Sequence, residues 1–452
     1  MAVTLPIVLL LLDYWPLERP GALAGRAMWP LIREKIPLFV IAGASAVVTL
    51  AIQPDRTLVD WETVSLASRA SNACLAYILY LRDLVFPGYL AVLYPFPQVS
   101  PPLWQPLLAF AALAGVSVAV TKTASVRRYL SVGWGWYLIT LVPVIGLVQV
   151  GFQTRADRYT YLPSIGLLVI LGWGAAEVHA RWGVRKVWFG VTAALILVAL
   201  ILVTRIQVGY WRDSVSLYER ALAVTSGNYP VHTNLARVLI SKGREAEAGR
   251  HYRRALEIKP DYLFAHYNYA VFLQRSGQLN AAIEHYRAAL RSDSSHLRSR
   301  YNLAVLLAGR GERKAAAEHY VRLLEIEPDH ASAHHNLGNL LKAEGAVSAA
   351  IGHYRRVVEI EPEHPRVHYN WGHTLQLQGK LDAARDHYRR VGRVPSDYAE
   401  AWYTRGIARA RAGRLEEAIE DLAEAIRLRP GWSEPQRALA ELRAGTPLSK
   451  SR

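Results

Sequence analysis

The chain has 452 residues, too many for one ordinary domain, and its composition changes near residue 210 from long apolar runs to a polar, repetitive part. The formal net charge is +16. Much of that charge lies in short loops between apolar runs, where membrane topology explains it better than nucleic-acid binding. The single cysteine, Cys74, excludes an intrachain disulfide and a CxxC site.

Residues 1–208 are predicted to form a membrane domain. Five apolar runs are long enough, or nearly so, to span a hydrocarbon core of about 30 Å. They are residues 36–53, 103–121, 130–150, 163–180 and 187–204. A shorter run at residues 2–12 lacks the basic segment of a signal peptide, and we interpret it as the end of a helix that begins before Met1.

Loop charges predict the orientation of this domain. Basic residues concentrate at 13–35, 122–128 and 181–186, whereas the loops at 54–71 and 151–162 carry only two each. The positive-inside rule places the first group in the cytoplasm and everything after residue 204 on the outer face. This alternation requires that residues 62–98 do not cross the membrane, which suits an interfacial or re-entrant helix.

One outer loop, GFQTRADRYTYLP, gathers charged and aromatic side chains. Its candidates for binding a phosphate are Arg155, Asp157, Arg158 and Tyr159. Arginine suits phosphate because its planar fork makes paired hydrogen bonds. Anchoring of a helix end at the membrane surface is the alternative interpretation.

The second half repeats with a period of 34 residues. Six units start at residues 229, 263, 297, 331, 365 and 399, with glycine at position 15 and a small residue at position 8 of every unit. Five of the six carry tyrosine at position 24. This is the tetratricopeptide repeat (TPR) pattern, in which each unit is a helical hairpin that buries its apolar face against its neighbours. Residues 229–432 thus form the array, 211–228 a joining half-repeat, and 433–452 a capping helix and tail, so the fold class is all-α.

Asparagine recurs at unit position 6, beside tyrosine at position 5. A side-chain amide can hold the backbone of an extended peptide, and tyrosine suits an adaptable groove. The predicted peptide-binding residues are Asn234, Asn268, Asn302, Asn336, Asn370, Tyr267, Tyr301 and Tyr369. Hydrogen bonding between adjacent helices is the structural alternative.

Histidine recurs at unit positions 4 and 23. A metal site needs several imidazoles about 2 Å from one ion, whereas side chains one repeat apart lie about 10 Å apart. We therefore interpret these histidines as packing and hydrogen-bonding residues and predict no metal site.

Two resemblances add to this interpretation. Units such as AHHNLGNLLKAEGAVSAAIGHYRRVVEIEPEH resemble the repeats of O-linked N-acetylglucosamine transferase, whose asparagine ladder holds acceptor polypeptide. The segments LLLLDYWPLERP, RASNACLAYILYLRDLVFPGYLAVLYPFP and TLVPVIGLVQVGFQTRADRYTYLPSIGL are similar to the transmembrane-and-TPR protein family, which includes luminal O-mannosyltransferases. That resemblance implies a glycosyltransferase fold of the multi-span type, a polyprenyl-phosphate sugar donor, a protein acceptor and, in the intact family, a divalent metal.

The same resemblance implies that a catalytic acid is missing. In that family several spans and an acidic outer loop precede the LLLLDYWPL segment, which here begins near Met1. Asp55, Asp60 and Glu62 do not match the family position. We therefore expect a membrane-anchored TPR protein without transfer activity of its own and without a cofactor, in a bacterial inner membrane with its array in the periplasm. A non-enzymatic scaffold for envelope proteins is the alternative.

Overall fold

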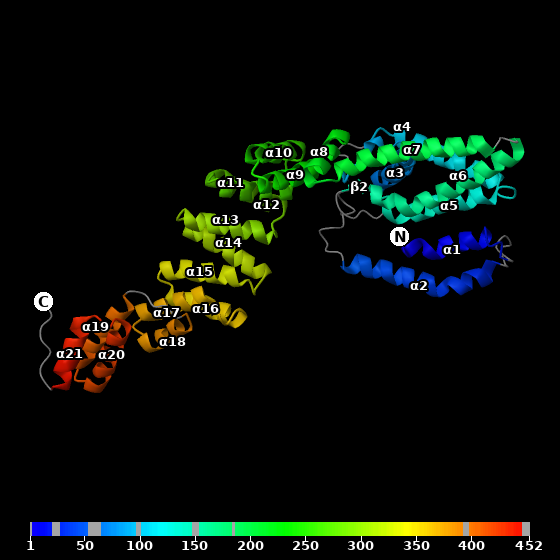
Figure 1. Ribbon diagram of the computed structural model, residues 1–452. Coiled ribbons are helices and arrows are strands. Elements are labelled where there is room, and N and C mark those ends of the chain that lie inside the picture. The colour runs from blue at the N-terminus through cyan, green and yellow to red at the C-terminus, as the bar shows by residue number, and fades with distance from the viewer. Residues whose placement is uncertain are drawn as a thin grey trace. The chain divides into compact units, whose positions relative to one another are not determined.

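The computed structural model describes residues 2–19, 28–52, 65–95, 101–146, 153–182, 186–391 and 397–444, almost all of them helical or in short turns (Figure 1). The fold class is all-α, as predicted. The chain forms two compact units, residues 1–268 and 269–452, which are described separately. Asp55, Asp60 and Glu62 lie outside the described residues.

The first unit begins with the helices of the membrane domain. They are α1 (Leu5–Tyr14), α2 (Trp29–Ile52), α3 (Leu66–Val85), α4 (Trp104–Lys122), α5 (Arg128–Leu141), α6 (Tyr161–Trp182) and α7 (Lys186–Tyr210). Within the described residues, three helical segments are long and apolar enough to cross a membrane: Trp104–Lys122, Asp157–Trp182 and Val187–Tyr210. These correspond to three of the five predicted runs.

The run predicted at residues 130–150 is not one continuous helix. Helix α5 has 14 residues, about 21 Å at the usual rise, and a 3-10 turn at Val142–Val144 follows it. Pro143 lies in that turn and has no backbone N–H to continue the helical ladder. The run is apolar, as the prediction required, but the helix ends at Leu141, before Pro143, and is too short to span a bilayer.

Helix α3 packs into the core of the membrane domain. Its Tyr80 is buried with Trp134 and Tyr137 of α5. The Tyr77 hydroxyl donates to the Leu138 carbonyl at 2.7 Å, which ties the two helices together. The segment predicted to be interfacial or re-entrant is therefore a helix whose apolar face contacts α5.

A short antiparallel strand pair lies at one end of these helices. Strands β1 (Tyr94–Pro95) and β2 (Gln153–Arg155) pair with Tyr94 opposite Arg155. The pairing places the predicted phosphate-binding loop, which includes β2, beside β1 in the segment that follows α3.

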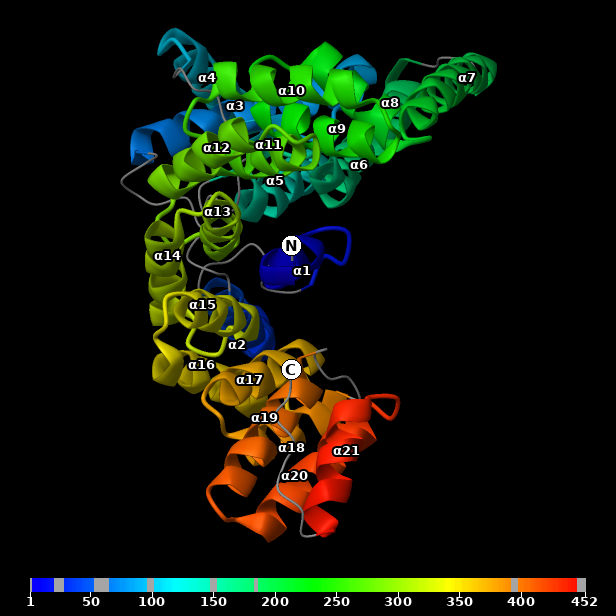
Figure 2. The ribbon, with the colours of Figure 1, turned by 90° about the vertical axis from the view of Figure 1, so that its left-hand side faces the viewer.

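The repeat helices follow the 34-residue period. After α8 (Ser214–Val224), the hairpins are α9 (Tyr229–Ser241) and α10 (Glu245–Ile258), α11 (Leu263–Arg275) and α12 (Leu279–Ser292), α13 (Leu297–Gly309) and α14 (Arg313–Ile326), α15 (Ala331–Ala343) and α16 (Val347–Ile360), α17 (Pro365–Leu377) and α18 (Leu381–Val391), and α19 (Tyr398–Arg411) and α20 (Leu415–Leu428). Helix α21 (Ser433–Arg443) follows α20, where a capping helix was predicted. Figure 2 shows the helices of the second unit following one another in pairs from α13 to α20.

The repeated small and large residues fit together as the period predicts. The glycine at position 15 has φ between 72° and 83° in all six units, which is the left-handed conformation that ends the first helix of each hairpin. At position 8, a Cβ on Gly338 would lie 2.7 Å from Cε1 of Tyr354, the position-24 tyrosine of the same unit. The two helices of that hairpin approach closely because one of them carries no side chain there.

The repeated histidines form pairs within hairpins. Position 4 contacts position 23 through the Nδ1 atoms: 2.9 Å for His232 and His251, 2.8 Å for His334 and His353, and 2.9 Å for His368 and His387. The predicted interpretation as interhelix hydrogen-bonding groups is confirmed for these six histidines.

The position-4 side chain also contacts the preceding unit. Nε2 of His334 lies 2.9 Å from the Pro328 carbonyl oxygen, and Nε2 of His368 lies 2.7 Å from that of Pro362. Gln436 of α21 makes the same contact with Pro430 at 2.7 Å. Since a carbonyl only accepts, Nε2 carries the proton and the neutral position-4 ring accepts at Nδ1 from its partner. We call this pair of contacts the histidine clasp.

The start of the array is joined directly to the membrane domain. Val92 and Leu93, which precede β1, pack beside Ala221 of α8 and Val231 of α9. The Asn228 amide donates to the Leu93 carbonyl at 3.0 Å. Helix α8 lies within residues 211–228, and its apolar face is covered by the segment between η3 (Pro87–Tyr89) and β1.

Candidate functional site

The predicted phosphate loop is held in place by buried polar contacts. Arg155 on β2 is 6% exposed and forms an ion pair with Asp83, near the end of α3, whose side chain is 3% exposed. Its guanidinium carbon lies 3.7 Å from the centre of the Tyr94 ring. Because its charge is already compensated by a buried carboxylate, Arg155 acts in this structure as a link between α3 and β2.

Asp157 has a similar structural role. It accepts hydrogen bonds from the Tyr94 hydroxyl at 2.9 Å and from the Ala91 backbone N–H at 3.0 Å. The Ala156 N–H donates to the Tyr80 hydroxyl at 3.0 Å. These contacts fix the loop on the end of α3 and on the segment that also covers α8.

The exposed cations of this region are Arg158 and Arg82. Arg158 is exposed, with its guanidinium carbon 5.1 Å from the centre of the half-buried Tyr159 ring. Arg82 binds Asp83 through Nε at 2.8 Å and Nη2 at 2.6 Å, and its side chain is 41% exposed. Of the four predicted residues, Arg158 therefore presents a cation at the surface. The phosphate prediction did not include Arg82, because only the fold brings α3 to this loop.

The asparagine row is engaged in contacts between helices. In the second unit the Asn302 amide donates to the Tyr286 hydroxyl at 3.1 Å, and the Asn336 amide donates to those of Tyr301 and Tyr320, both at 3.1 Å. These tyrosines belong to the preceding hairpin. The donor end of each amide thus joins neighbouring units, as the structural alternative expects, while no described residue donates to the amide oxygens of Asn302 and Asn336.

The other asparagines differ in their partners. Asn268, in the first unit, donates to the Phe264 carbonyl of its own helix at 2.7 Å, and Asn234 is half-buried on α9. Asn370 donates to Nε2 of His335 and Oδ1 of Asn339, each at 2.9 Å. Burial, with the nearby His364 as a smaller cause, lowers the pKa of His335 to about 4. This ring therefore stays neutral at pH 7 and can accept that hydrogen bond.

The predicted tyrosines lie near these amides. Tyr267 and Tyr301 are half-buried on α11 and α13, and the Tyr301 ring stacks on His330 at 5.3 Å. Tyr369 and Asn370 line one hollow of about 380 Å³ together with Pro365, Arg366 and Val391. The structure therefore brings two predicted peptide-binding residues together at a cavity, beside an exposed arginine.

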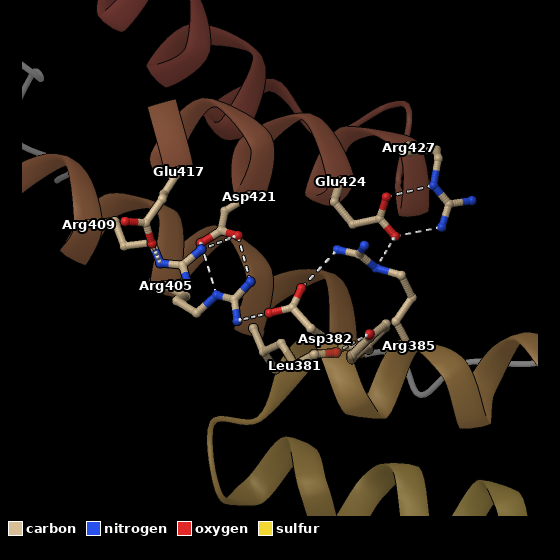
Figure 3. Close-up of polar contacts among 10 residues, drawn as sticks. Leu381, Asp382, Arg385, Arg405, Arg409, Glu417, Asp421, Glu424 and Arg427 are labelled. Carbon is tan, nitrogen blue, oxygen red and sulfur yellow. Dashed lines mark hydrogen bonds and ion pairs between the residues drawn. The ribbon is translucent and has the colours of Figure 1, made fainter. Parts of the chain in front are cut away.

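The last repeat carries an ion-pair network that the sequence analysis did not predict. Asp421, 1% exposed, accepts from Nη2 of Arg405 at 2.7 Å and from Nη1 of Arg409 at 2.9 Å (Figure 3). Arg405 and Arg385 lie over the Trp402 ring, with guanidinium carbons 4.4 and 4.3 Å from its centre. Trp402 and Asp421 occupy unit positions 4 and 23, where three other units carry a histidine pair. The absence of both histidines from the last unit is the feature of the sequence that could have indicated this network.

Comparison with known families identifies the class of the array. Profiles described as tetratricopeptide repeat match residues 204–262, 251–284, 273–341 and 369–431, and one described as TPR repeat matches 338–379. The C-terminal half of the chain is a tetratricopeptide repeat array, and the matched region begins inside α7. The chain is a TPR membrane protein.

Segments of the chain are similar to individual proteins. A 129-residue segment is 35% identical to the human protein O-mannosyl-transferase TMTC4 and covers 28% of this chain and 17% of that protein. A 146-residue segment is 27% identical to the Drosophila melanogaster protein O-mannosyl-transferase Tmtc3 and covers 31% and 16%. The aligned segments thus span about a sixth of the length of these relatives.

Solved structures give further likenesses. YrrB, a TPR protein with an unusual peptide-binding site, is 24% identical over 41% of this chain and 96% of its own, with a TM-score of 0.34. MamA is 22% identical over 35% of this chain and 92% of its own, with a TM-score of 0.34.

Proposed function

We propose that the TPR array binds extended segments of acceptor protein and presents them to a membrane domain of the protein O-mannosyltransferase kind. The observation that carries the binding part is the hollow at Tyr369 and Asn370, together with the amide oxygens of Asn302 and Asn336 that no described residue occupies. A peptide backbone N–H can donate to such an oxygen whatever its sequence. The similarity to O-mannosyl-transferases supports the transfer part.

The donor in this proposal is a sugar on a polyprenyl phosphate. Arg158 is the residue proposed to meet its phosphate, and Arg82 the second cation. Arg155 and Asp157 support the loop from behind, through Asp83 and Tyr94. We assign no catalytic acid among the described residues.

The groove is tested with two sets of variants that remove hydrogen bonds of the same amides from opposite sides. Asn302→Ala with Asn336→Ala removes the groove amides, whereas Tyr286→Phe with Tyr320→Phe removes one hydroxyl partner of each amide and leaves the contact from Asn336 to Tyr301. Binding of a fluorescent, unfolded Ser/Thr-rich polypeptide is measured by anisotropy. We expect the asparagine set to weaken binding about tenfold and the tyrosine set to change it less than about twofold, because only the first removes an acceptor for the peptide. Equal losses in both sets would show that the amides only join helices.

Donor binding is tested by adding a radiolabelled mannosyl polyprenyl phosphate to the reconstituted chain. Arg158→Gln should lower its retention several-fold, and Arg291→Gln on α12, in the repeat array, is a charge-matched control. If the array binds peptide and no lipid-linked sugar is retained, the chain is a scaffold and the transferase proposal is wrong.

The proposed location is a bacterial inner membrane with the array in the periplasm. A reporter that matures only outside the cytoplasm, fused after Arg452, should be active. Activity of a cytoplasmic reporter at the same place would reverse the orientation.

A further inference from the structure

The end of helix α7 carries a pocket that the proposed function does not use. It has a volume of about 500 Å³ and lies where α7 meets α8, within the first unit. Its lining includes Ile206, Tyr210, Arg212, Ser216, Glu219 and Arg220. The volume falls within the range of small-ligand sites, about 300–1,000 Å³.

The length of α7 places this pocket at the membrane surface. The helix has 25 residues, about 37 Å at the usual rise, against about 30 Å of hydrocarbon core. Its long apolar stretch is followed by Arg205, so the last turn, which ends at Tyr210, lies at the level of the headgroups. Trp211, directly after the helix, is 60% exposed, as is typical of aromatic side chains at the bilayer surface.

The protein surface beside the end of α7 is partly apolar. The Gln207 amide donates to the Pro87 carbonyl at 2.7 Å and so ties α7 to the turn after α3. Directly before that turn, Val85 at the end of α3 and Phe86 are about two-thirds exposed, at 66% and 67%. Large apolar side chains exposed beside a membrane helix are covered at the lowest cost by lipid.

Two arginine side chains line the pocket, and their hydrogen-bond donors are only partly paired with protein groups among the described residues. Arg220 lies over the Tyr210 ring, with its guanidinium carbon 4.6 Å from the ring centre, and Nη2 donates to the Gly88 carbonyl. Its Nε is buried and has no hydrogen-bond partner among the described residues. Arg212 has an 80% exposed side chain, and among the described residues its ion-pair partner is Asp213, at 3.5 Å.

We propose that this pocket binds the phosphate of an anionic membrane lipid, with the phosphate between Arg212 and Arg220 and the acyl chains along α7. Two arginines converging on one hollow favour a phosphate diester, because the guanidinium group pairs with two of its oxygens. Ser216 adds a hydroxyl donor, and Glu219 limits the excess charge so that one phosphate neutralises the site. The first hairpins of the array are thereby held at the lipid surface through a bound headgroup as well as through the chain.

The test uses the full chain in a mild detergent with equal amounts of phosphatidylglycerol and phosphatidylcholine, and native mass spectrometry counts the lipids retained. We expect one phosphatidylglycerol to be retained in preference. Arg212→Gln with Arg220→Gln should weaken that binding about a hundredfold, since each lost charge-assisted hydrogen bond costs about one decade. Arg212→Gln alone, at an 80% exposed side chain, should show part of the loss with unchanged thermal unfolding, which guards against a folding defect in the double variant.

Arg205→Gln is the matched control, because it removes the same charge from the exposed surface of α7 outside the pocket. An equal loss in this control would mean diffuse attraction by basic residues and would overturn the proposal. So would unchanged retention in the Arg212 and Arg220 variants. Glycerol phosphate is the last arm: if it competes at the concentration of the lipid, the site binds a free anion and the lipid assignment is wrong.

Discussion

Acidification should loosen the repeat array through the histidine clasp. In the pair formed by His368 and His387, the two Nδ1 atoms share one proton at 2.9 Å, and Nε2 of His368 contacts the Pro362 carbonyl. A proton added to this pair makes one buried or half-buried ring a cation, and a proton at Nδ1 of His368 would also remove the shared hydrogen bond. Burial, followed by the neighbouring His368, lowers the pKa of His387 to about 4.

The sign and size follow from proton linkage. A histidine in the unfolded chain has a pKa of about 6.5, so between about pH 6.5 and 4 the unfolded state binds more protons than the folded state. The clasp therefore contributes its full stability above about pH 7 and loses it as the pH falls through that window. The pKa difference of about 2.5 units corresponds to roughly 3 kcal/mol at most. Because the His387 ring is partly exposed and screened by solvent, we expect about 1 kcal/mol at pH 5.

Hydrogen exchange measures this loss locally and requires no two-state unfolding of the whole array. The full chain is compared at about pH 7.5 and about pH 5, with correction for intrinsic exchange rates. The amides of α17 and α18 should lose protection by about fivefold at the lower pH, which corresponds to about 1 kcal/mol. In His387→Gln, whose amide can still donate to Nδ1 of His368, the pH dependence of these two helices should fall. Equal protection at both pH values in the natural chain, or an undiminished pH dependence in the variant, would refute the reasoning.

Three predictions concern the packing and the ion pairs, with thermal unfolding in detergent as the measurement. Asp421→Asn should cost about 3 kcal/mol, because it leaves two arginines beside a buried group without charge; an unchanged midpoint would contradict this. Gly338→Ala should cost about 1–3 kcal/mol through overlap with Tyr354, whereas Gly352→Ala, where nothing lies within 4 Å of the new Cβ, should be neutral or stabilising. Asp83→Asn should destabilise the membrane domain by about 3 kcal/mol, since its arginine partner is buried, and neutralising that arginine as well should recover part of the loss.

The regular part of this fold could be predicted because it repeats. A 34-residue period places the hairpins, and position-15 glycine marks the end of each first helix, since both features depend on local backbone geometry and on neighbouring units. Contacts between distant segments were not accessible in the same way. Arg155 meets Asp83 across 72 residues, and nothing in the RADRY motif indicates that a carboxylate from α3 occupies its arginine.

The repeated polar residues show a second limit. The periods of histidine and asparagine were visible, but a period alone does not identify the partner of a side chain. Pairing of position 4 with position 23, and of Asn336 with Tyr320, depends on how two helices face each other. The stop after Leu141 was also missed, because hydropathy does not register the missing N–H of Pro143.

The junction between the membrane domain and the array makes the two ends of the solenoid unequal. At the first end, α8 is already covered by the segment before β1, and the Ala91 N–H of the same segment donates to Asp157. At the other end, α21 packs on the last hairpin, and its Gln436 donates to the carbonyl of Pro430 in the preceding unit. His334 and His368 make the same kind of contact in their hairpins. Hairpins between α9 and α21 can therefore be gained or lost while the contact to the carbonyl of the preceding unit forms again, whereas removal of α8 would uncover the segment before β1. Lineages of this protein should differ in reach at the C-terminal end and keep their first hairpin constant.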